Sequence, residues 1–532
     1  MENKEKFLYG ASVQGIQSFI FQTNKLKEIA GASELVEEIC TSKFAQEVYS
    51  SPKITYEKAK ETLRGDKNAI TFAAGNIKYI FESEADCQKV VLNFPKVISE
   101  FAPGITISQA VVKFKDDDFA NAVNELENRL RTQRNKPMRS ATLGMIGILQ
   151  SRQTGLPAVM KSNKGEEYYD AATRAKLFID LEGTKDRTAL NLCKKAFGDE
   201  TISKDQVAFD IEKMTDKNDW IAIIHADGNG LGQIVQKIGT KDQLFKEFSQ
   251  NLDIATANAA IAAYDAVKSK FEGKDIIPIR PVVLSGDDLT LICRADLALE
   301  YTKTFIEEFE NGTKKELGEI IEQNNVFEFG EVRDRLTACA GIAYIKSSYP
   351  FYYGYELAEA LCTYAKKDAK DNDNIREGKE LPQSCLMFHK VQDSFTENYD
   401  EISKRELQPH PDISFEFGPY YLREKTNRWT INELIDKADK LKGKEGNAVK
   451  SHLRNWMSLL YYNKEMAKQK LERLKSMTSM KEFINEVTDV KEERKRKVDN
   501  KTVTHYPVYD ILAIHTINTQ TTKKEKAKEV EL

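Results

Sequence analysis

Apolar and polar positions along the chain follow a strand, turn, helix, hairpin, strand order that occurs twice. Strands are indicated where apolar residues run together or alternate with polar ones, and hairpins where two such runs flank a glycine-containing turn. The first copy comprises 7–21, 70–81 and 104–114, and the second comprises 220–235, 280–293 and 336–345. This β–α–β–β–α–β order is that of a ferredoxin-like domain. The sequence therefore predicts an α+β fold with two ferredoxin-like, palm-type domains.

The remaining segments differ in pattern from the two copies. Mixed sequence connects the copies, and apolar residues at helical spacing among many Lys and Glu over 434–477 predict a helical C-terminal region. The last residues lack core-forming side chains, and we expect them to be disordered. The predicted domains are a first palm at 1–135, a connecting domain at 136–216, a second palm at 217–390, a helical domain at 391–515 and a tail at 516–532.

Composition narrows the class of protein. Hydrophobic residues make up 41% of the 532 positions and charged residues 30%, with a net charge of −4, so bulk charge does not favour coating nucleic acid. No apolar run approaches the roughly 20 residues that cross a bilayer, and we expect no signal peptide before Phe7. Seven scattered cysteines without a CxxC pair favour a reducing compartment over disulfides or a zinc knuckle. We expect a cytoplasmic protein without a membrane segment.

The first candidate for chemistry follows the apolar strand 221–224. Asp227 is expected just past the end of this strand, at the rim of a sheet. It is followed by a glycine-rich turn, and we expect a helix to begin near Gln233. Glycines allow the backbone to approach a ligand, and N–H groups at a helix start attract phosphate. The candidate nucleotide-binding positions of this turn are Gly228, Asn229, Gly230, Leu231 and Gly232.

A second candidate is the hairpin at Ser285, Gly286, Asp287 and Asp288. A Gly-Asp-Asp sequence also forms ordinary hairpin turns, which is the bland alternative. A palm fold, however, brings the end of its first strand beside this hairpin, so Asp227 joins the pair. Three carboxylates at one place suit two Mg²⁺ or Mn²⁺ ions that activate a hydroxyl and stabilise a leaving pyrophosphate.

A helix over 356–370 provides candidate cations. Lys366 or Lys370 could reach a triphosphate as a point charge. The alternative, that lysines simply favour a helix C-terminus, is of equal weight. His225, two residues before Asp227, is interpreted as structural.

These motifs carry a resemblance. Asp227-Gly-Asn-Gly-Leu-Gly, Ser285-Gly-Asp-Asp-Leu, Gly341-Ile-Ala and the helix 357–366 together resemble the catalytic palm of the large polymerase-like subunit of type III CRISPR complexes. The first half resembles that subunit's inactive palm through 15–21 and 25–33. Residues 1–390 are covered by this resemblance, and the second palm is more distantly similar to GGDEF-type diguanylate cyclases and class III nucleotidyl cyclases.

The resemblance implies a function. In that family the active palm joins ATP 3′ to 5′ into cyclic oligoadenylates, which are second messengers in antiviral defence. By resemblance, Asp227, Asp287 and Asp288 hold the two metal ions, Gly228 lies with them, the 228–232 backbone cradles phosphates, and Lys366 matches the family's lysine. Implied partners are ATP, guide RNA, target RNA and other CRISPR-type subunits, and an oligomer is compatible with the sequence.

Departures from the family pattern refine this. No histidine stands in a His-Asp pair, so we expect no DNase activity, and 151–158 has Ser and Thr where the family has zinc-binding cysteines. Ser285 replaces a glycine, and we expect activity to survive this change. The leading hypothesis is a nucleotidyltransferase. The alternatives are a non-catalytic or regulatory scaffold subunit of a type III CRISPR-like complex and, with less support, a cyclase that uses GTP.

Overall fold

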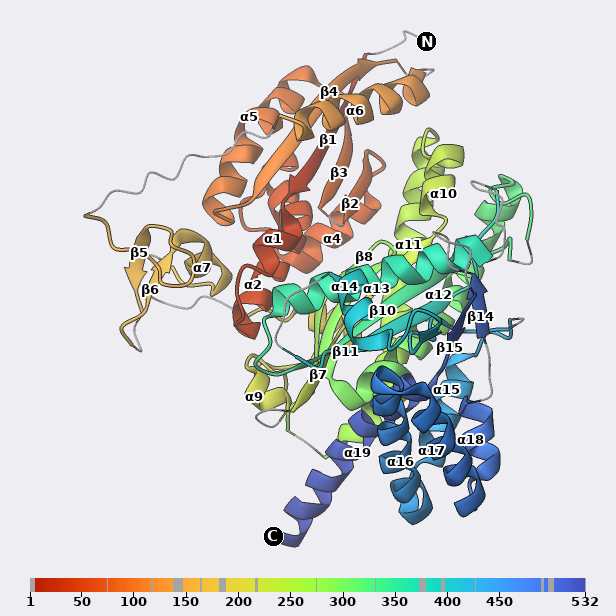
Figure 1. Ribbon diagram of the computed structural model, residues 1–532. Coiled ribbons are helices and arrows are strands. Elements are labelled where there is room, and N and C mark those ends of the chain that lie inside the picture. The colour runs from red at the N-terminus through yellow and green to blue at the C-terminus, as the bar shows by residue number, and fades with distance from the viewer. Residues whose placement is uncertain are drawn as a thin grey trace.

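The chain forms two palm-like bodies and a C-terminal helical region, joined by a small connecting segment (Figure 1). The computed structural model describes residues 5–531 except 74, 116–117, 137–146, 163–164, 181–187, 216–218, 274, 331, 373–378, 394–397, 426, 489–491 and 496–501. Ala74, part of the first predicted hairpin, lies outside the described residues.

The first palm is built on a four-stranded antiparallel sheet in the order β2-β3-β1-β4. Buried side chains on its two faces belong to two different cores, one shared with α5 and the other with α6. Its strands are β1 (Lys6–Gln14), β2 (Ala69–Ala73), β3 (Asn76–Phe81) and β4 (Thr106–Phe114). Its helices are α1 (Ile16–Ile20), α2 (Leu26–Glu38), η1 (Ile39–Lys43), α3 (Phe44–Val48), α4 (Tyr56–Gly65), α5 (Glu84–Phe101) and α6 (Phe119–Arg134).

The second palm has a six-stranded sheet in the order β13-β11-β10-β7-β9-β8. The segment β10-β7-β9-β8 repeats the order β4-β1-β3-β2 of the first palm, so the two predicted ferredoxin-like domains are confirmed. Parallel pairing of β11 with β10 extends this sheet beyond the prediction. The strands are β7 (Trp220–Asn229), β8 (Ile279–Ser285), β9 (Asp288–Arg294), β10 (Thr337–Lys346), β11 (Cys385–Lys390) and β13 (Tyr420–Tyr421), and the helices are α10 (Leu231–Ile238), α11 (Asp242–Lys268), η3 (Ser269–Phe271), α12 (Ala295–Gln323) and α13 (Phe351–Asn372).

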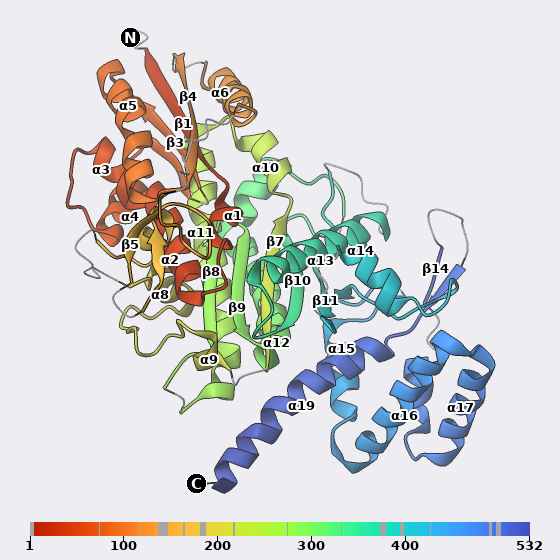
Figure 2. The same cartoon turned by 60° about the vertical axis from the view of Figure 1, so that its left-hand side comes forward.

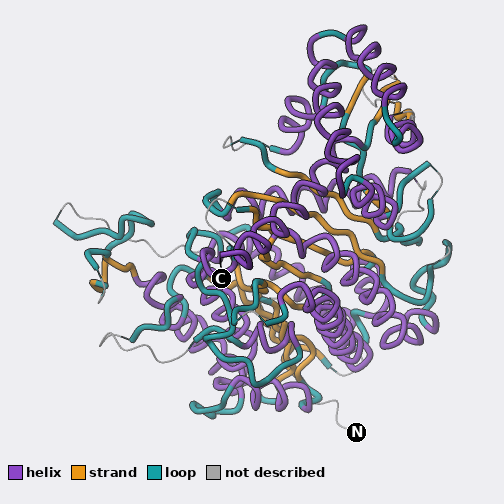
Figure 3. The backbone as a smooth tube through the Cα atoms, turned by 90° about the horizontal axis from the view of Figure 1, so that it is seen from below, coloured by secondary structure: helices purple, strands orange, loops and turns teal. Residues whose placement is uncertain are grey.

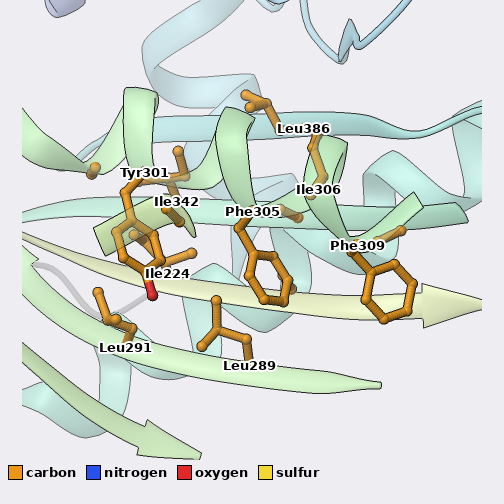
Figure 4. Packing of buried hydrophobic residues seen from close by; sticks show 14 of the residues in the cluster. Ile224, Leu289, Leu291, Tyr301, Phe305, Ile306, Phe309, Ile342 and Leu386 are labelled. Atoms are coloured by element: carbon orange, nitrogen blue, oxygen red, sulfur yellow. The ribbon is translucent and has the colours of Figure 1, made fainter. Parts of the chain in front are cut away.

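Both faces of this second sheet are buried, which explains its continuous apolar runs. Figure 4 shows Tyr301, Phe305 and Phe309 of α12 packed on side chains from four strands of the sheet. Helix α13 covers the opposite face so closely that a Cβ at Gly341 of β10 would lie 2.0 Å from the Ala358 carbonyl oxygen. The sheet is therefore sandwiched between α11 and α12 on one side and α13 on the other.

Strand alternation in β7 decides which face carries the polar residues. Ala222 and Ile224 belong to the core under α12, whereas Ile221 and Ile223 belong to the core under α13. Because side chains alternate along a strand, the odd-numbered Asp227 falls on the α13 face.

The first palm contacts the second where α2 meets β8 and where β2 meets α11 (Figure 2). Further contacts join the segment after α1 to α13. The Asn24 side chain accepts a hydrogen bond from the backbone N–H of Phe351 (3.0 Å) at the start of α13. The rings of Phe21 and Tyr355 stack with centroids 4.4 Å apart. The first palm therefore holds the N-terminal part of α13.

The connecting segment lies beside both palms, and its two-stranded piece projects from the main body (Figure 3). It contains β5 (Ala158–Lys161), β6 (Tyr168–Asp170), α7 (Ala171–Lys176), α8 (Asn191–Phe197) and α9 (Ile211–Met214). All seven cysteines of the chain are buried and free.

The C-terminal region is mainly helical, as predicted. It also contains a three-stranded sheet in the order β12-β15-β14 that the sequence analysis missed. The last helix, α19, continues to Glu531, so the predicted disorder of the tail is replaced by helix. The elements are α14 (Tyr399–Ile402), η4 (Ser403–Leu407), β12 (Ile413–Ser414), α15 (Ile431–Lys440), α16 (Gly443–Tyr462), α17 (Lys464–Met477), α18 (Lys481–Thr488), β14 (Glu492–Lys495), β15 (Thr502–His505) and α19 (Val508–Glu531). Within the described residues, no helix is long and apolar enough to span a membrane.

Candidate active site

Two of the predicted acids face each other across neighbouring strands. Asp227 on β7 is the direct partner of Asp288 on β9. Asp288 also pairs with Ser285, so Gly286 and Asp287 form a two-residue turn between them. Gly286 has φ of 63°, as the first central position of a type II′ turn requires. The expectation that Asp227 lies past the strand end is wrong, because pairing with β10 extends β7 to Asn229.

Close packing fixes the position of Asp287. The N–H of Gly228 donates to the Asp287 carbonyl oxygen (3.1 Å). A Cβ at Gly228 would lie 2.7 Å from the Cβ of Asp287, so only glycine lets the turn come this near to β7. The Thr256 hydroxyl donates to the Gly286 carbonyl (2.5 Å) and anchors the turn to α11. The three acids are thereby held at one end of the sheet.

Burial of the carboxylates and, after it, their mutual repulsion are the main electrostatic features of the site. Burial, with the nearby charge of Asp227, raises the pKa of Asp287 to about 7. Burial, followed by the charges of Asp227 and Asp287, raises the pKa of Asp288 well above its usual value. Atom Oδ1 of Asp288 is buried without a hydrogen-bond partner in the described part of the chain. Such groups are costly unless a cation approaches them.

Lys366 supplies part of the opposing charge. Its Nζ donates to Asp227 Oδ2 and to the carbonyl oxygen of Gly228 (3.0 Å). Burial opposes its charge, but Asp227 outweighs burial and raises the pKa of Lys366. Lys370, one turn further along α13, is exposed, and no hydrogen bond or ion pair described in the structure links it to the acids. Of the two candidate lysines, the structure brings only Lys366 to the site.

His225 lies behind the acids. Its Nδ1 is 3.2 Å from the Thr290 hydroxyl and 3.4 Å from Asp288 Oδ1, and its ring meets Tyr355 edge-on. Burial lowers its pKa to about 4, so the ring is neutral near pH 7. The contact to Asp288 was not expected from the sequence.

Part of the glycine-rich turn is buried against neighbouring side chains, whereas the sequence predicted a turn open to a ligand. The Asn229 amide is buried and donates to Thr337 Oγ1 (3.1 Å) and Cys339 Sγ (3.4 Å). A Cβ at Gly230 would lie 2.5 Å from Leu381, whereas one at Gly232 would meet no described atom within 4 Å. Helix α10 begins at Leu231, with Gly230 as its N-cap, rather than near Gln233. The role of 228–232 in holding phosphate stays a prediction.

The acids are chemically suited to a hard divalent cation. They offer carboxylate oxygens only, which Mg²⁺ and Mn²⁺ prefer, and the unpartnered oxygen of Asp288 fits such an ion. Among the described residues, no group of three or more His, Cys, Asp or Glu side chains is placed so that protein ligands alone would hold a metal ion. Mg²⁺ typically completes its coordination with water and substrate phosphates, and the site fits that open arrangement.

A cavity of about 750 Å³ opens beside the acids, between the two palms. Its wall combines residues of α1 and α6 from the first palm with residues of β8, β9 and α13 from the second. The sequence analysis missed most of this wall, because its members lie far apart in the chain. Members with charged or hydrogen-bonding side chains include Gln17, Glu37, Arg134, Ser285, Asp288, Tyr355, Glu356 and Glu359.

Comparisons with known proteins find similarity at the second palm and in the fold of the chain. Residues 220–375 match the model of the Cas10/Cmr2 second palm domain. The fold matches a chain of a Csm1–Csm4 cassette solved with AMPPNP, at 14% identity and a TM-score of 0.54, covering 97% of this chain and 70% of that one. A structure of the cassette with cA4 matches at 12% identity and 0.51, and the apo cassette at 14% and 0.51, with the same coverage. No curated protein matches the sequence.

Proposed function

We propose that this Cas10-like palm-domain protein is a metal-dependent nucleotidyltransferase that joins ATP into cyclic or linear oligoadenylates. The observation that supports it most is the pairing of Asp227 with Asp288 across β7 and β9, with Asp287 and Lys366 beside them, at the edge of an inter-palm cavity. An unpartnered carboxylate oxygen beside repelling acids is costly to keep without a cationic ligand.

The proposed step is a phosphoryl substitution. The 3′ oxygen of one nucleotide forms a bond to the α-phosphorus of another, and the α–β anhydride bond breaks with its electron pair leaving on pyrophosphate. The hydroxyl proton passes by way of the acids to solvent. Two bound Mg²⁺ or Mn²⁺ ions would lower the charge on both oxygens. Asp227, Asp287 and Asp288 would hold the ions, and Lys366 would add fixed positive charge near the phosphates.

The comparisons suggest the setting. The cassette structures that share this fold contain Csm4, and two of them were solved in complex with AMPPNP and with cA4. We therefore include in the proposal a Csm4-like subunit, guide RNA and target RNA as partners, and a cytoplasmic location. The proposal also keeps the first four domains given above, with α19 continuing past residue 515.

The test is incubation of the full-length protein with each nucleoside triphosphate and Mg²⁺ or Mn²⁺. Products are identified by mass spectrometry and released pyrophosphate is measured. We expect oligoadenylate from the wild type and none from Asp287→Ala/Asp288→Ala. A control, Glu356→Gln, changes an acid that lines the same cavity but is not one of the three.

The second candidate is a scaffold or regulatory subunit. It is favoured by the similarity of 97% of the chain to a subunit of a cassette. Wild type and the double alanine variant would then give equal, background pyrophosphate release even with a Csm4-like partner and target RNA present.

A further inference from the structure

The wall of the inter-palm cavity away from Lys366 is acidic. Apart from Asp288 of the acid site, its described charged side chains are the carboxylates of Glu37, Glu356 and Glu359 and a single guanidinium, Arg134. A triphosphate is not attracted to such a surface, since like charges repel in a partly buried cleft. This wall therefore suits the neutral nucleoside part of a nucleotide.

Helix α13 determines the distance between this wall and Lys366, where the phosphates would bind. Glu359 and Lys366 are seven residues apart, two helical turns, which puts them on one face about 10.5 Å apart. Lys366 contacts Asp227 and the carbonyl of Gly228. A nucleotide lying along α13 with its phosphates at Lys366 therefore has its base near Glu359.

The polar groups around Glu359 have a defined hydrogen-bonding pattern. The Gln17 amide nitrogen donates to the Tyr355 hydroxyl (2.6 Å) and lies 3.4 Å from Glu359 Oε1. A carboxylate only accepts, so the amide nitrogen must face it, and the Gln17 carbonyl oxygen is left as an acceptor. The Tyr355 hydroxyl accepts from Gln17 and can donate its own hydrogen. The wall thus offers one donor, the Tyr355 hydroxyl, and two acceptors, the Glu359 carboxylate and the Gln17 carbonyl oxygen.

This pattern complements an exocyclic amino group next to an unprotonated ring nitrogen. Adenine and cytosine have that edge. Guanine and uracil present a carbonyl and an N–H there, and a carbonyl facing a carboxylate leaves buried acceptors unpaired. Apolar side chains of Val282 and Leu284 line the same cavity and suit the faces of a base.

We propose that Glu359 is a specificity-determining residue: it accepts a hydrogen bond from the exocyclic amino group of the base, and so favours ATP over GTP. This inference rests on the proposed function, because it concerns the substrate of the same site. Gln17 and Tyr355 act with it by orienting the carboxylate and by donating to the ring nitrogen.

The experiment compares wild type, Glu359→Gln and the matched control Glu356→Gln in the full-length protein. The measured quantity is the ratio of kcat/KM for ATP to kcat/KM for GTP, with CTP and UTP as further arms. Because a glutamine amide can donate to a carbonyl, we expect Glu359→Gln to lower the ATP-to-GTP ratio at least about tenfold, the scale of one buried polar mismatch. Glu356→Gln should keep the wild-type ratio. CTP turnover close to that of ATP would show that the site recognises only the amino edge of the base. Much slower CTP turnover would show that it also recognises the size of a purine.

The same three proteins are tested for binding of ATP and GTP by calorimetry with Mg²⁺. An unchanged ATP preference in Glu359→Gln, in turnover or in binding, would overturn the inference. Absence of turnover in the wild type would count against the proposed function, while the binding preference still decides the role of Glu359. Tyr355→Phe retains the ring stack on Phe21, and we expect it to weaken ATP binding without loss of folding.

Discussion

The two palms share a sheet order but differ at the strand positions where the second palm has its acids. Ser12 pairs with Asn76 in the first palm, and Asp227 pairs with Asp288 in the second. The Ser12 hydroxyl lies 3.1 Å from Asn76 Oδ1 and donates to it. The corresponding acids cannot bond to each other when both are ionised, and burial together with the charge of Asp227 raises the pKa of Asp288.

The same backbone arrangement thus supports a stabilising polar pair in one palm and an acid site in the other. A satisfied neutral pair stabilises the first palm, whereas repelling acids reduce the stability of the second. The first palm instead holds the start of α13 through Asn24, in the loop between α1 and α2, and both of these helices line the cavity. One palm thus carries the proposed chemistry and the other shapes the space beside it.

The largest expected effect comes from making the second palm like the first. Asp288→Asn should lower kcat/KM for pyrophosphate release by about 10²–10³, the scale of losing a group that stabilises transition-state charge. The variant should also melt slightly higher without metal, because one repelling charge is gone. The reverse change, Asn76→Asp, should leave turnover unchanged, since Ser12 supplies no second acid. Full activity in Asp288→Asn would remove the distinction between the palms.

The next effect concerns the junction of the palms. Asp253 on α11 forms ion pairs with Lys60 and Arg64 on α4 and with Lys195 on α8 (2.5 Å). Removing its charge leaves three cations close together in a mostly buried place. Asp253→Asn should lower the free energy of unfolding by about 3 kcal/mol, measured by urea denaturation. Asp265→Asn, an exposed change on the same helix, should have little effect, and equal losses would show that the cluster does not join the palms.

Metal addition should distinguish the two palms through a smaller effect, a change in melting temperature. A cation that binds only the folded protein stabilises it by about 2.7 kcal/mol at a hundredfold excess over Kd. Mg²⁺ should therefore raise the melting temperature of the wild type by several degrees. The increase should shrink in Asp288→Asn and persist in Asn76→Asp. An equal increase in all three proteins would place the cation elsewhere.

The smallest effect tests the neutral pair. Ser12→Ala removes the hydrogen bond to Asn76 and should cost about 1 kcal/mol of unfolding free energy. Turnover should stay at the wild-type value, because Ser12 lies outside the cavity wall. Lost turnover at normal stability would mean that the first palm takes a direct part in the reaction.

Much of the fold could be predicted from the sequence because local patterns determine it. Apolar runs around Gly286 indicated the second hairpin, and helical spacing after the last palm strand indicated α13. The pairing of Asp227 with the hairpin followed from palm topology once both copies were identified. What failed depended on distant partners: β7 continues through Gly228 and Asn229 because β10 lies beside them.

The cavity wall could not be predicted at all. Gln17 and Glu359 are 342 positions apart, and no local pattern marks either as a ligand residue. A single glutamate on a helix is ordinarily a solvated residue. Its meaning appears only when the first palm brings Gln17 to it.

Gly341 positions the helix that would contact both the base and the phosphates of the proposed nucleotide. The hydrogen in place of its side chain lets α13 rest directly on β10, at a depth that a single methyl group would prohibit. Glu359 and Lys366 both lie on α13. A displacement of this helix away from β10 would therefore move the base contact and the phosphate contact outward together. The distance between the two contacts is determined by the geometry of α13. Their distance from the acids depends on the lack of a Cβ at Gly341.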